Sequence, residues 1–227
     1  MEALEVANQS DFSQSALEAA ISLYAFTWGE IIRTELHIDS DSGLRELLHM
    51  QQLTRKVVFP EGQRAVIDKT TGLPVGTINS LLYNSHEFPM VESWNQLTGD
   101  GYHMTHDPKG DSLICVAIQT SKRGAARQLV EVQADLAKRL GKNLFVFTRP
   151  NGYAAYLQGH PGVTIEQYLE LVVKGRLEIP GDGVSFHNHI GAVLAPLLKG
   201  SKPYLHNSRP GDASSLSYNV LMQYPLL

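Results

Sequence analysis

The stretch Leu113-Ile-Cys-Val-Ala-Ile-Gln119 is a continuous apolar run, and Gly124–Leu140 carries apolar residues three and four positions apart. The first pattern predicts a buried strand and the second an amphipathic helix. Gly141 is the residue type that most often ends a helix, and Asn143–Thr148 is a second apolar run. Loops this short between a strand, a helix and a strand are typical of a right-handed unit with parallel strands. Residues 113–148 therefore predict an α/β fold.

The sequence on either side predicts further helices and strands. Before this unit we expect helices at Ser15–Thr34 and Asp41–Leu53, a hairpin of Gln63–Asp68 and Val75–Tyr83, and a long polar loop over residues 84–110. After it we expect a capped helix at Thr164–Lys174 and strands at Val184–His189, Val193–Leu198 and Ser215–Gln223. This order predicts one domain over residues 1–227, with a mixed central sheet and N-terminal helices.

Composition excludes several classes of protein. The chain has 227 residues, 43% of them apolar and 19% charged, which is typical of a globular domain and not of a disordered chain. A formal net charge of −4 is unfavourable for binding nucleic acid. Cys115 is the single cysteine, which excludes an internal disulfide and a thiolate zinc cluster. Its apolar neighbours predict a packed thiol and not a nucleophile.

The chain shows no sign of a membrane segment. No stretch approaches the roughly 18 consecutive apolar residues that a spanning helix needs. The first residues, Met1-Glu-Ala-Leu-Glu5, are acidic, unlike the basic start of a signal peptide. We therefore expect a cytoplasmic protein with no membrane partner.

The turn between the central strand and helix, Ser121–Gln128, has the features of an anion site. Unpaired amides at a helix N-terminus attract negative charge, and small residues let a phosphate approach them. The small residues are Gly124, Ala125 and Ala126, and the nearby basic ones are Lys122, Arg123 and Arg127. An ordinary turn with solvated basic residues is the alternative interpretation. A nucleoside-triphosphate loop is excluded because its G-x-x-x-x-G-K-[ST] pattern is absent.

The segment Ser121-Lys-Arg-Gly-Ala-Ala126 resembles the acyl-CoA loop of the GNAT superfamily of acetyltransferases, whose pattern is Arg/Gln-x-x-Gly-x-Gly/Ala. It departs at the first position, where serine replaces Arg or Gln, and Lys122 or Arg123 is the expected replacement. The element order matches the GNAT fold over roughly residues 15–225. The resemblance implies that acyl-CoA is bound by Val116, Ile118, Lys122, Arg123, Gly124, Ala125, Ala126 and Arg127.

Three C-terminal segments narrow the resemblance. Phe147-Thr-Arg149, Val184-Ser-Phe-His187 and Ser208-Arg-Pro-Gly-Asp212 are similar to parts of the GNAT-like loading domains of polyketide synthases, the curacin type, and of GNAT domains fused to carbon–nitrogen hydrolases. Compared with that pattern, extra residues lie between Thr148 and Glu166 and between Ala192 and Arg209, and we expect both in loops. The resemblance implies decarboxylation of malonyl-CoA or methylmalonyl-CoA to an acyl starter for an acyl carrier protein, with no tightly bound cofactor and no metal. The chain is then a free-standing protein or a domain of a synthase.

By motif position, the resemblance carries the catalytic roles to Thr148, His187 and Arg209. Loss of CO₂ from a malonyl thioester leaves an enolate, so catalysis requires donors to the carbonyl oxygen. His187 and the Thr148 hydroxyl suit that role, and either is a candidate proton donor to the carbanion carbon. A guanidinium such as Arg209 suits the departing carboxylate.

Four further residues are candidates for the substrate cleft: Trp28, Trp94, Thr98 and His189. In the predicted strand, residues 187 and 189 share a face, so both histidines would line one cleft. Trp94 or Thr98 would lie over the acyl group, although a core tryptophan fits the pattern equally well. Trp28 lies on the apolar face of the first helix, which borders the acyl cleft in this fold.

Two other functions remain open. A conventional acetyl-CoA-dependent N-acetyltransferase would use a tyrosine such as Tyr218 or Tyr224 as its acid. A non-catalytic module would only position a neighbouring domain of a synthase. The joint presence of Thr148, His187 and Arg209 favours an enzyme over such a module.

Overall fold

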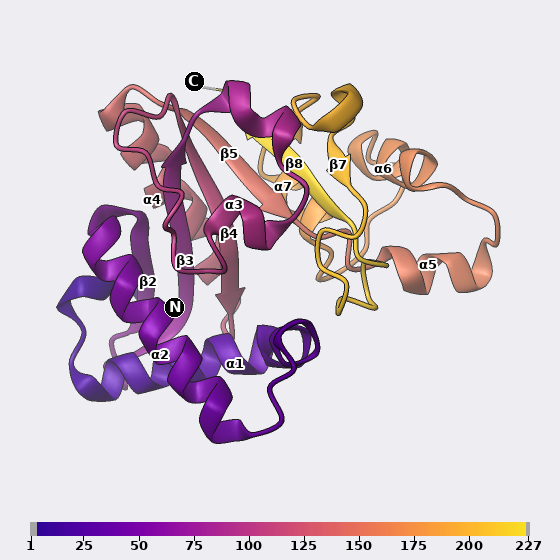
Figure 1. Ribbon diagram of the computed structural model, residues 1–227. Coiled ribbons are helices and arrows are strands. Elements are labelled where there is room, and N and C mark those ends of the chain that lie inside the picture. The colour runs from indigo at the N-terminus through magenta and orange to yellow at the C-terminus, as the bar shows by residue number, and fades with distance from the viewer. Residues whose placement is uncertain (1–3, 226–227) are drawn as a thin grey trace.

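One mixed sheet of eight strands runs through residues 4–225, the part of the chain that a computed structural model describes (Figure 1). The strand order is β1-β2-β3-β4-β5-β8-β6, and β7 pairs with β8. The strands are β1 Leu4–Asn8, β2 Gln63–Asp68, β3 Leu73–Tyr83, β4 Ser112–Thr120, β5 Asn143–Thr148, β6 Val193–Leu194, β7 Tyr204–Leu205 and β8 Asn219–Tyr224. Met1–Ala3, part of the acidic start noted above, and residues 226–227 lie outside the described residues.

Helices cover both faces of this sheet. They are α1 Gln14–Leu36, α2 Asp41–Val58, α3 Trp94–Thr98, α4 Ala125–Leu140, α5 Tyr153–Gly159, α6 Ile165–Val173 and α7 Gly183–His189, with short 3-10 turns at Gln9–Asp11, Pro60–Gly62, Ser85–Met90 and Lys199–Ser201. On one face, α4, α6 and α7 pack in a single apolar cluster with β2 to β5 and β8. On the other, α1 and α2 form one cluster, and the segment around α3 forms another with β4, β5 and β8.

The central strand–helix–strand unit is confirmed. β4 and β5 pair in parallel and α4 crosses between them, while the other strand pairs are antiparallel. Gly141 ends α4 in the left-handed conformation, at φ 65°. The hairpin of β2 and β3 and the capping box of α6 also form as predicted. The predicted α/β fold with a mixed sheet is therefore correct.

The prediction of a strand at Val184–His189 is wrong, because this segment is helix α7. Its sequence fits a strand, in which every second residue is buried, and equally a helix, in which residues three positions apart are buried. In the structure the buried residues are Val184 and His187, which are three positions apart. The N-terminal cap decides between strand and helix: the Asp182 carboxylate accepts a hydrogen bond from the Ser185 amide at 2.8 Å.

Several other boundaries differ from the predictions. β8 starts at Asn219 and not at Ser215, since Leu216 and Ser217 have positive φ angles that a strand does not allow. Of Val193–Leu198, two residues pair, in β6. Strand β1 and helix α5 were not predicted, and α5 occupies part of the insertion after Thr148 that we expected to be loop. The predicted loop over residues 84–110 contains α3.

Candidate functional site

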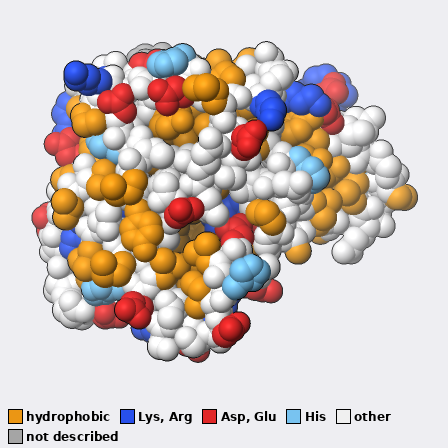
Figure 2. All heavy atoms as spheres, viewed as in Figure 1, with side chains coloured by type: hydrophobic (Ala, Val, Ile, Leu, Met, Phe, Trp, Pro, Cys, Tyr) orange, Lys and Arg blue, Asp and Glu red, His pale blue; other side chains and the backbone are white. Residues whose placement is uncertain are grey.

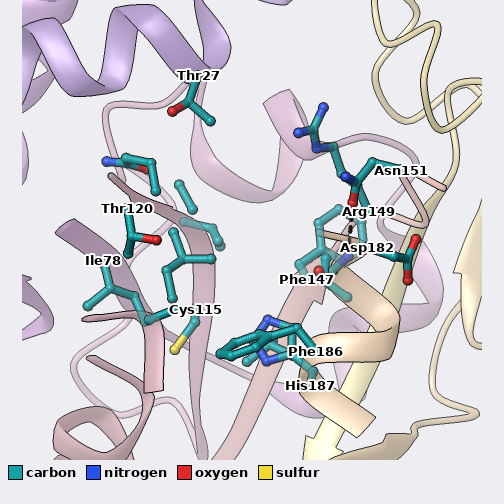
Figure 3. Close-up of a pocket in the computed structure, with 18 of the residues that line it drawn as sticks. Thr27, Ile78, Cys115, Thr120, Phe147, Arg149, Asn151, Asp182, Phe186 and His187 are labelled. Atoms are coloured by element: carbon teal, nitrogen blue, oxygen red, sulfur yellow. Dashed lines mark hydrogen bonds between the residues drawn. The ribbon is translucent and has the colours of Figure 1, made fainter. Parts of the chain in front are cut away.

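The candidate site is a cavity of about 440 Å³ that opens where β4 and β5 diverge (Figure 3). The two strands pair from Ser112 with Asn143 to Cys115 with Val146. Beyond that point, residues of both strands line the cavity. A bulge contributes to the divergence: Asn79 pairs with Ala117 and Ser80 with Cys115, so the residue between them on β4 has no partner on β3.

The predicted acyl-CoA loop lies at one end of this cavity. Thr120 and Ala126, on either side of the loop, both line it. Gly124 caps α4 with a φ of 86°, and no side chain caps this helix. The Ala125 amide bonds to the Lys122 carbonyl at 3.3 Å, whereas the amides of Ala126 and Arg127 have no acceptor within the helix, and the small side chain of Ala126 leaves room above them. The arrangement suits an anion such as a pyrophosphate.

The side chains of the loop are held in place by neighbouring elements. Both the amide and the hydroxyl of Ser121 bond to the Val75 carbonyl, at 2.8 and 3.3 Å, so the unexpected serine ties the loop to β3. Lys122 forms an ion pair of 2.8 Å with Asp68, which holds the pKa of that carboxyl below its usual value together with the Thr70 amide. The exposed Arg127 pairs with Glu131 at 2.9 Å, and Arg123 is exposed.

Val116 and Ile118 both line the cavity, as predicted. The Val116 carbonyl accepts a hydrogen bond of 2.7 Å from the indole of Trp94, which fixes the bulge from the opposite face of the sheet. Cys115 also lines the cavity. Cys115 is buried in the core, which confirms the prediction of a packed thiol, and burial raises the pKa of this thiol to about 12.

Thr148 and His187 come together in this cavity although they lie 39 positions apart in the sequence. Gly183 makes the approach possible. A Cβ atom there would lie 2.7 Å from the Arg149 carbonyl and closer still to Thr148 Oγ1. With glycine, α7 starts against the end of β5, and its next turn carries His187 into the cavity (Figure 3).

The imidazole of His187 is neutral and has a defined hydrogen-bond partner. Burial lowers its pKa to about 3. Its Nδ1 lies 2.7 Å from the hydroxyl of Tyr224 on β8. Burial raises the pKa of Tyr224, so this phenol keeps its proton and is able to donate it to Nδ1. In the tautomer that accepts this hydrogen bond, the imidazole proton lies on Nε2, where it can be donated to a ligand.

The buried Asp182 fixes the start of α7. Its carboxylate accepts hydrogen bonds from the Gly152 amide at 2.9 Å, the Tyr168 hydroxyl at 3.0 Å and the Ser185 amide. Burial raises the pKa of this carboxyl, and these donors partly offset the effect. Asp182 therefore ties α5, α6 and α7 together beside the cavity. It was not among the site residues predicted from the sequence.

The prediction that His189 shares the cleft with His187 is wrong. Positions two apart on a helix face in nearly opposite directions, whereas on a strand they face the same way. His189 is exposed and does not line the cavity. Tyr218, one of the two candidate acids, also lies outside it and stacks on His206.

Of the other predicted cleft residues, Trp28 lines the cavity, and its indole donates to Gln119 Oε1 at 3.1 Å. Trp94 and Thr98 do not line it. The Thr98 hydroxyl instead bonds to the Trp94 carbonyl and accepts from the Gly101 amide, which holds α3 and its following turn.

Arg209 does not line the cavity either. It is 2% exposed and forms a bidentate ion pair with Glu35, at 3.1 and 3.0 Å. Its guanidinium stacks 4.2 Å from the ring of Trp94 and lies 5.7 Å from Trp28. The guanidinium that does line the cavity belongs to Arg149, directly after Thr148. The motif Phe147-Thr-Arg149 contained it, but no role was assigned to it from the sequence.

Residues 4–225 show no sign of a metal centre or of a membrane-spanning helix. Within this part of the chain, no cluster of three or more His, Cys, Asp or Glu side chains has the arrangement to hold a metal. None of the helices described is both long and apolar enough to cross a membrane. On the face shown in Figure 2, Lys and Arg side chains are interspersed with acidic ones and form no continuous basic stripe.

Comparisons with known sequences give partial matches. No model of a known protein family matches the chain. In Bacillus subtilis, the probable hydrolase YhcX is 28% identical over 171 residues, which are 73% of this chain but 31% of YhcX. The uncharacterized N-acetyltransferase YkwB of the same organism is 29% identical over 174 residues, 73% of this chain and 69% of YkwB.

Solved structures match nearly the whole chain. The loading GNATL domain of CurA from Lyngbya majuscula has a TM-score of 0.71 at 17% identity, over 99% of this chain and 98% of that one. The GphF GNAT-like decarboxylase, in complex with isobutyryl-CoA, has a TM-score of 0.68 at 21% identity, over 98% and 100%. This chain therefore has the fold of the GNAT superfamily, in the form found in GNAT-like decarboxylase and loading domains.

Proposed function

We propose that this protein is a GNAT-like decarboxylase that converts malonyl-CoA or methylmalonyl-CoA into the acyl starter unit for an acyl carrier protein in polyketide biosynthesis. The observation that carries the proposal is the pair of hydrogen-bond donors in the cavity. His187 is neutral, with Tyr224 bonded to its Nδ1, and Thr148 lines the same cavity. This is the donor set that a developing thioester enolate requires.

The substrate's CoA portion would occupy the β4–α4 side of the cavity. Its pyrophosphate would meet the first amides of α4, and its pantetheine arm would run along β4 beyond Cys115, where the pairing with β5 ends. Of the basic residues in the loop, Arg123 and Arg127 are exposed, and Lys122 is paired with Asp68. The backbone amides would therefore bind the pyrophosphate, and these side chains would add a weaker electrostatic attraction.

In the proposed reaction, the bond between the carboxylate carbon and the α carbon breaks. Its electron pair forms the enolate of the thioester, and the carboxylate leaves as CO₂. Donation from His187 Nε2–H and the Thr148 hydroxyl stabilises the charge on the enolate oxygen. A proton delivered to the α carbon, directly or through water, completes the conversion to acyl-CoA.

Arg209 is the third residue that the resemblance places in this reaction, as the partner of the departing carboxylate. In the structure its guanidinium is bonded to Glu35 and lies outside the cavity. To hold the substrate it would have to leave that buried carboxylate, which is costly for both charges.

A conventional N-acetyltransferase is the second candidate. It requires a base for the amine, and Asp182 is the carboxylate among the cavity's described residues. Both of its oxygens accept hydrogen bonds from α5, α6 or α7. The candidate acid Tyr224 is bonded to His187. Because these groups already have hydrogen-bond partners within the protein, they favour decarboxylation over acetyl transfer to an amine. The donor pair of His187 and Thr148 also favours an enzyme over a non-catalytic module.

The test is to incubate the protein with malonyl-CoA, with and without an acyl carrier protein, and to follow the products by mass spectrometry. We expect loss of CO₂ without any amine acceptor, and the acetyl group on the carrier when it is present. Intact malonyl-CoA, together with acetylation of amines from acetyl-CoA, would favour the second candidate.

A further inference from the structure

Arg149 is the only Lys or Arg among the described residues that line the cavity. Its side chain is 17% exposed and extends from the end of β5 into the space between that strand and α1 (Figure 3). His187 is neutral, so the guanidinium of Arg149 supplies the positive charge of this cavity. A charged acyl group that extends to this end of the cavity would therefore meet it.

This guanidinium is held on two sides. It stacks 4.4 Å from the ring of Trp28, whose own position is fixed by Gln119. Its Nη1 lies 3.1 Å from Asp212 Oδ2. Asp212 is itself buried and accepts hydrogen bonds from the hydroxyls of Ser214 and Ser215. Burial raises the pKa of Asp212, but the charge of Arg149 and these hydroxyls outweigh it and hold the pKa below its usual value.

The guanidinium of Arg149 still has donors to offer. Its ion pair with Asp212 uses Nη1, and within residues 4–225 its Nε and Nη2 have no carboxylate partner. Arg209 differs on each count: Nε and Nη2 are both bonded to Glu35, and the side chain is 2% exposed. Arg149 is oriented with Nε and Nη2 left for a ligand, whereas in Arg209 both of these atoms are bonded to Glu35.

We infer that Arg149 is the specificity-determining residue that recognises the carboxylate of the acyl group and so selects malonyl-type thioesters over acetyl-CoA. The inference rests on the proposed function. Because the carboxylate loses its charge as CO₂ departs, a cation that held it too strongly would stabilise the substrate more than the transition state. The carboxylate of Asp212 already neutralises much of the charge of Arg149, so Arg149 does not stabilise the bound substrate too strongly. The same ion pair keeps the guanidinium in its orientation.

The test measures the binding of two thioesters that the enzyme cannot decarboxylate. Sulfoacetyl-CoA carries a sulfonate where malonyl-CoA has its carboxylate, and acetyl-CoA lacks the anion. We expect wild type to prefer sulfoacetyl-CoA. Arg149→Gln should weaken its binding by about 10–100-fold, the range for a hydrogen bond between charged groups, and leave acetyl-CoA binding within about threefold. Arg149→Lys should keep part of the preference, since it keeps the charge but not the fork.

The control removes the other arginine without leaving a buried charge. The double variant Arg209→Met with Glu35→Leu replaces both charged residues of the buried ion pair by apolar ones. Binding of acetyl-CoA shows whether this variant is folded. We expect it to keep the preference for sulfoacetyl-CoA. If it loses that preference, or if Arg149→Gln keeps it, the inference is overturned.

Turnover separates this inference from the proposed function. In malonyl-CoA decarboxylation, Arg149→Gln should raise KM by about 10-fold or more and change kcat by only a few-fold, as expected for a contact made mainly in the bound substrate. Wild type that prefers sulfoacetyl-CoA but leaves malonyl-CoA intact contradicts the proposed function and not this inference. Wild type that decarboxylates malonyl-CoA without preferring the anion contradicts the inference alone.

Discussion

The two sides of the cavity are built on different principles. The β4–α4 side offers backbone: a strand edge without a partner beyond Cys115 and a helix N-terminus with small residues above it. The β5–α7 side offers the side chains of Thr148, Arg149 and His187, and the last two are oriented by residues from other elements. Backbone groups keep their positions when surface side chains change, whereas an oriented side chain depends on every contact behind it. The first side suits binding of CoA and the second suits chemistry on the acyl group.

The largest effect should come from blocking the backbone side. Ala126→Glu places a long carboxylate over the first amides of α4, where it clashes with and repels a pyrophosphate. We expect CoA binding to fall below detection in calorimetry. Ala155→Glu, the same change at an exposed position of α5, serves as the control and should bind CoA normally. Unchanged affinity in Ala126→Glu would mean that CoA is bound elsewhere.

The next effect should come from removing the donors on the side-chain side. His187→Ala should lower kcat for decarboxylation by about 10²–10³-fold, the usual cost of one such donor, and Thr148→Val should lower it less. The two losses should combine less than additively, because both donors act on one charge. CoA binding should be retained in both variants.

The exposed His189 provides the matched control for that series. Since it lies outside the cavity, His189→Ala should keep nearly full activity. Loss of turnover in His189→Ala but not in His187→Ala would move the catalytic role to the other histidine.

A smaller effect should follow from moving α7 away from β5. In Gly183→Ala the new methyl group would overlap Thr148 Oγ1 and the Arg149 carbonyl, so the helix must shift. We expect a loss of about 1–3 kcal/mol in the free energy of unfolding, with a lower kcat. Denaturant titration and kinetics measure the two. Gly159→Ala is the control, because a Cβ there meets nothing within 4 Å.

The sequence predicts the backbone side far better than the side-chain side. Residues 113–148 form a local unit, so hydrophobic period, a small-residue turn and Gly141 are enough to predict β4, α4 and β5. The segment Val184–His189 fits two periods equally well, and the decision depends on Asp182, whose partners Gly152 and Tyr168 lie 30 and 14 positions away. The cap that Asp182 makes with the Ser185 amide is a local signal for a helix that the sequence analysis missed, whereas no local pattern reports the two distant contacts.

The arginines illustrate the same limit at the level of single residues. From the sequence, Arg149 and Arg209 are both loop arginines near apolar segments, and the resemblance selects Arg209. What distinguishes them is the partner of each: Glu35 belongs to α1, 174 positions from Arg209. Asp212, which orients Arg149, lies only three residues beyond Arg209 itself. Only the folded chain shows which guanidinium faces the cavity.

A weaker effect should come from Tyr224→Phe, which removes the hydroxyl bonded to His187 Nδ1 and nothing else. Without that donor, the imidazole proton is free to move from Nε2 to Nδ1, and the fraction of productive tautomer falls. We expect kcat to drop about 5–10-fold, in line with the loss of one hydrogen bond. The ¹⁵N shifts of the imidazole should show a mixed tautomer in the variant and a single one in wild type. A drop in kcat with an unchanged tautomer would show that Tyr224 acts only through packing.

The smallest expected effect on turnover concerns pH. The folded pKa of His187 is about 3, while an unperturbed histidine titrates near pH ~6.5, so this imidazole stays neutral throughout the range in which the free residue would gain its charge. We expect kcat to show no inflection from His187 between about pH 5 and 8.

The free energy of unfolding should depend on pH even though kcat does not. The unfolded chain binds a proton at this residue below about pH 6.5 and the folded chain does not until about pH 3, so the free energy of unfolding should decrease as pH falls through that window. The buried His103, whose pKa burial also lowers, should add to the same slope. A limb of kcat near pH 6.5 that follows the titration of His187 in NMR spectra would show instead that water reaches this imidazole, and the donor would then be an imidazolium.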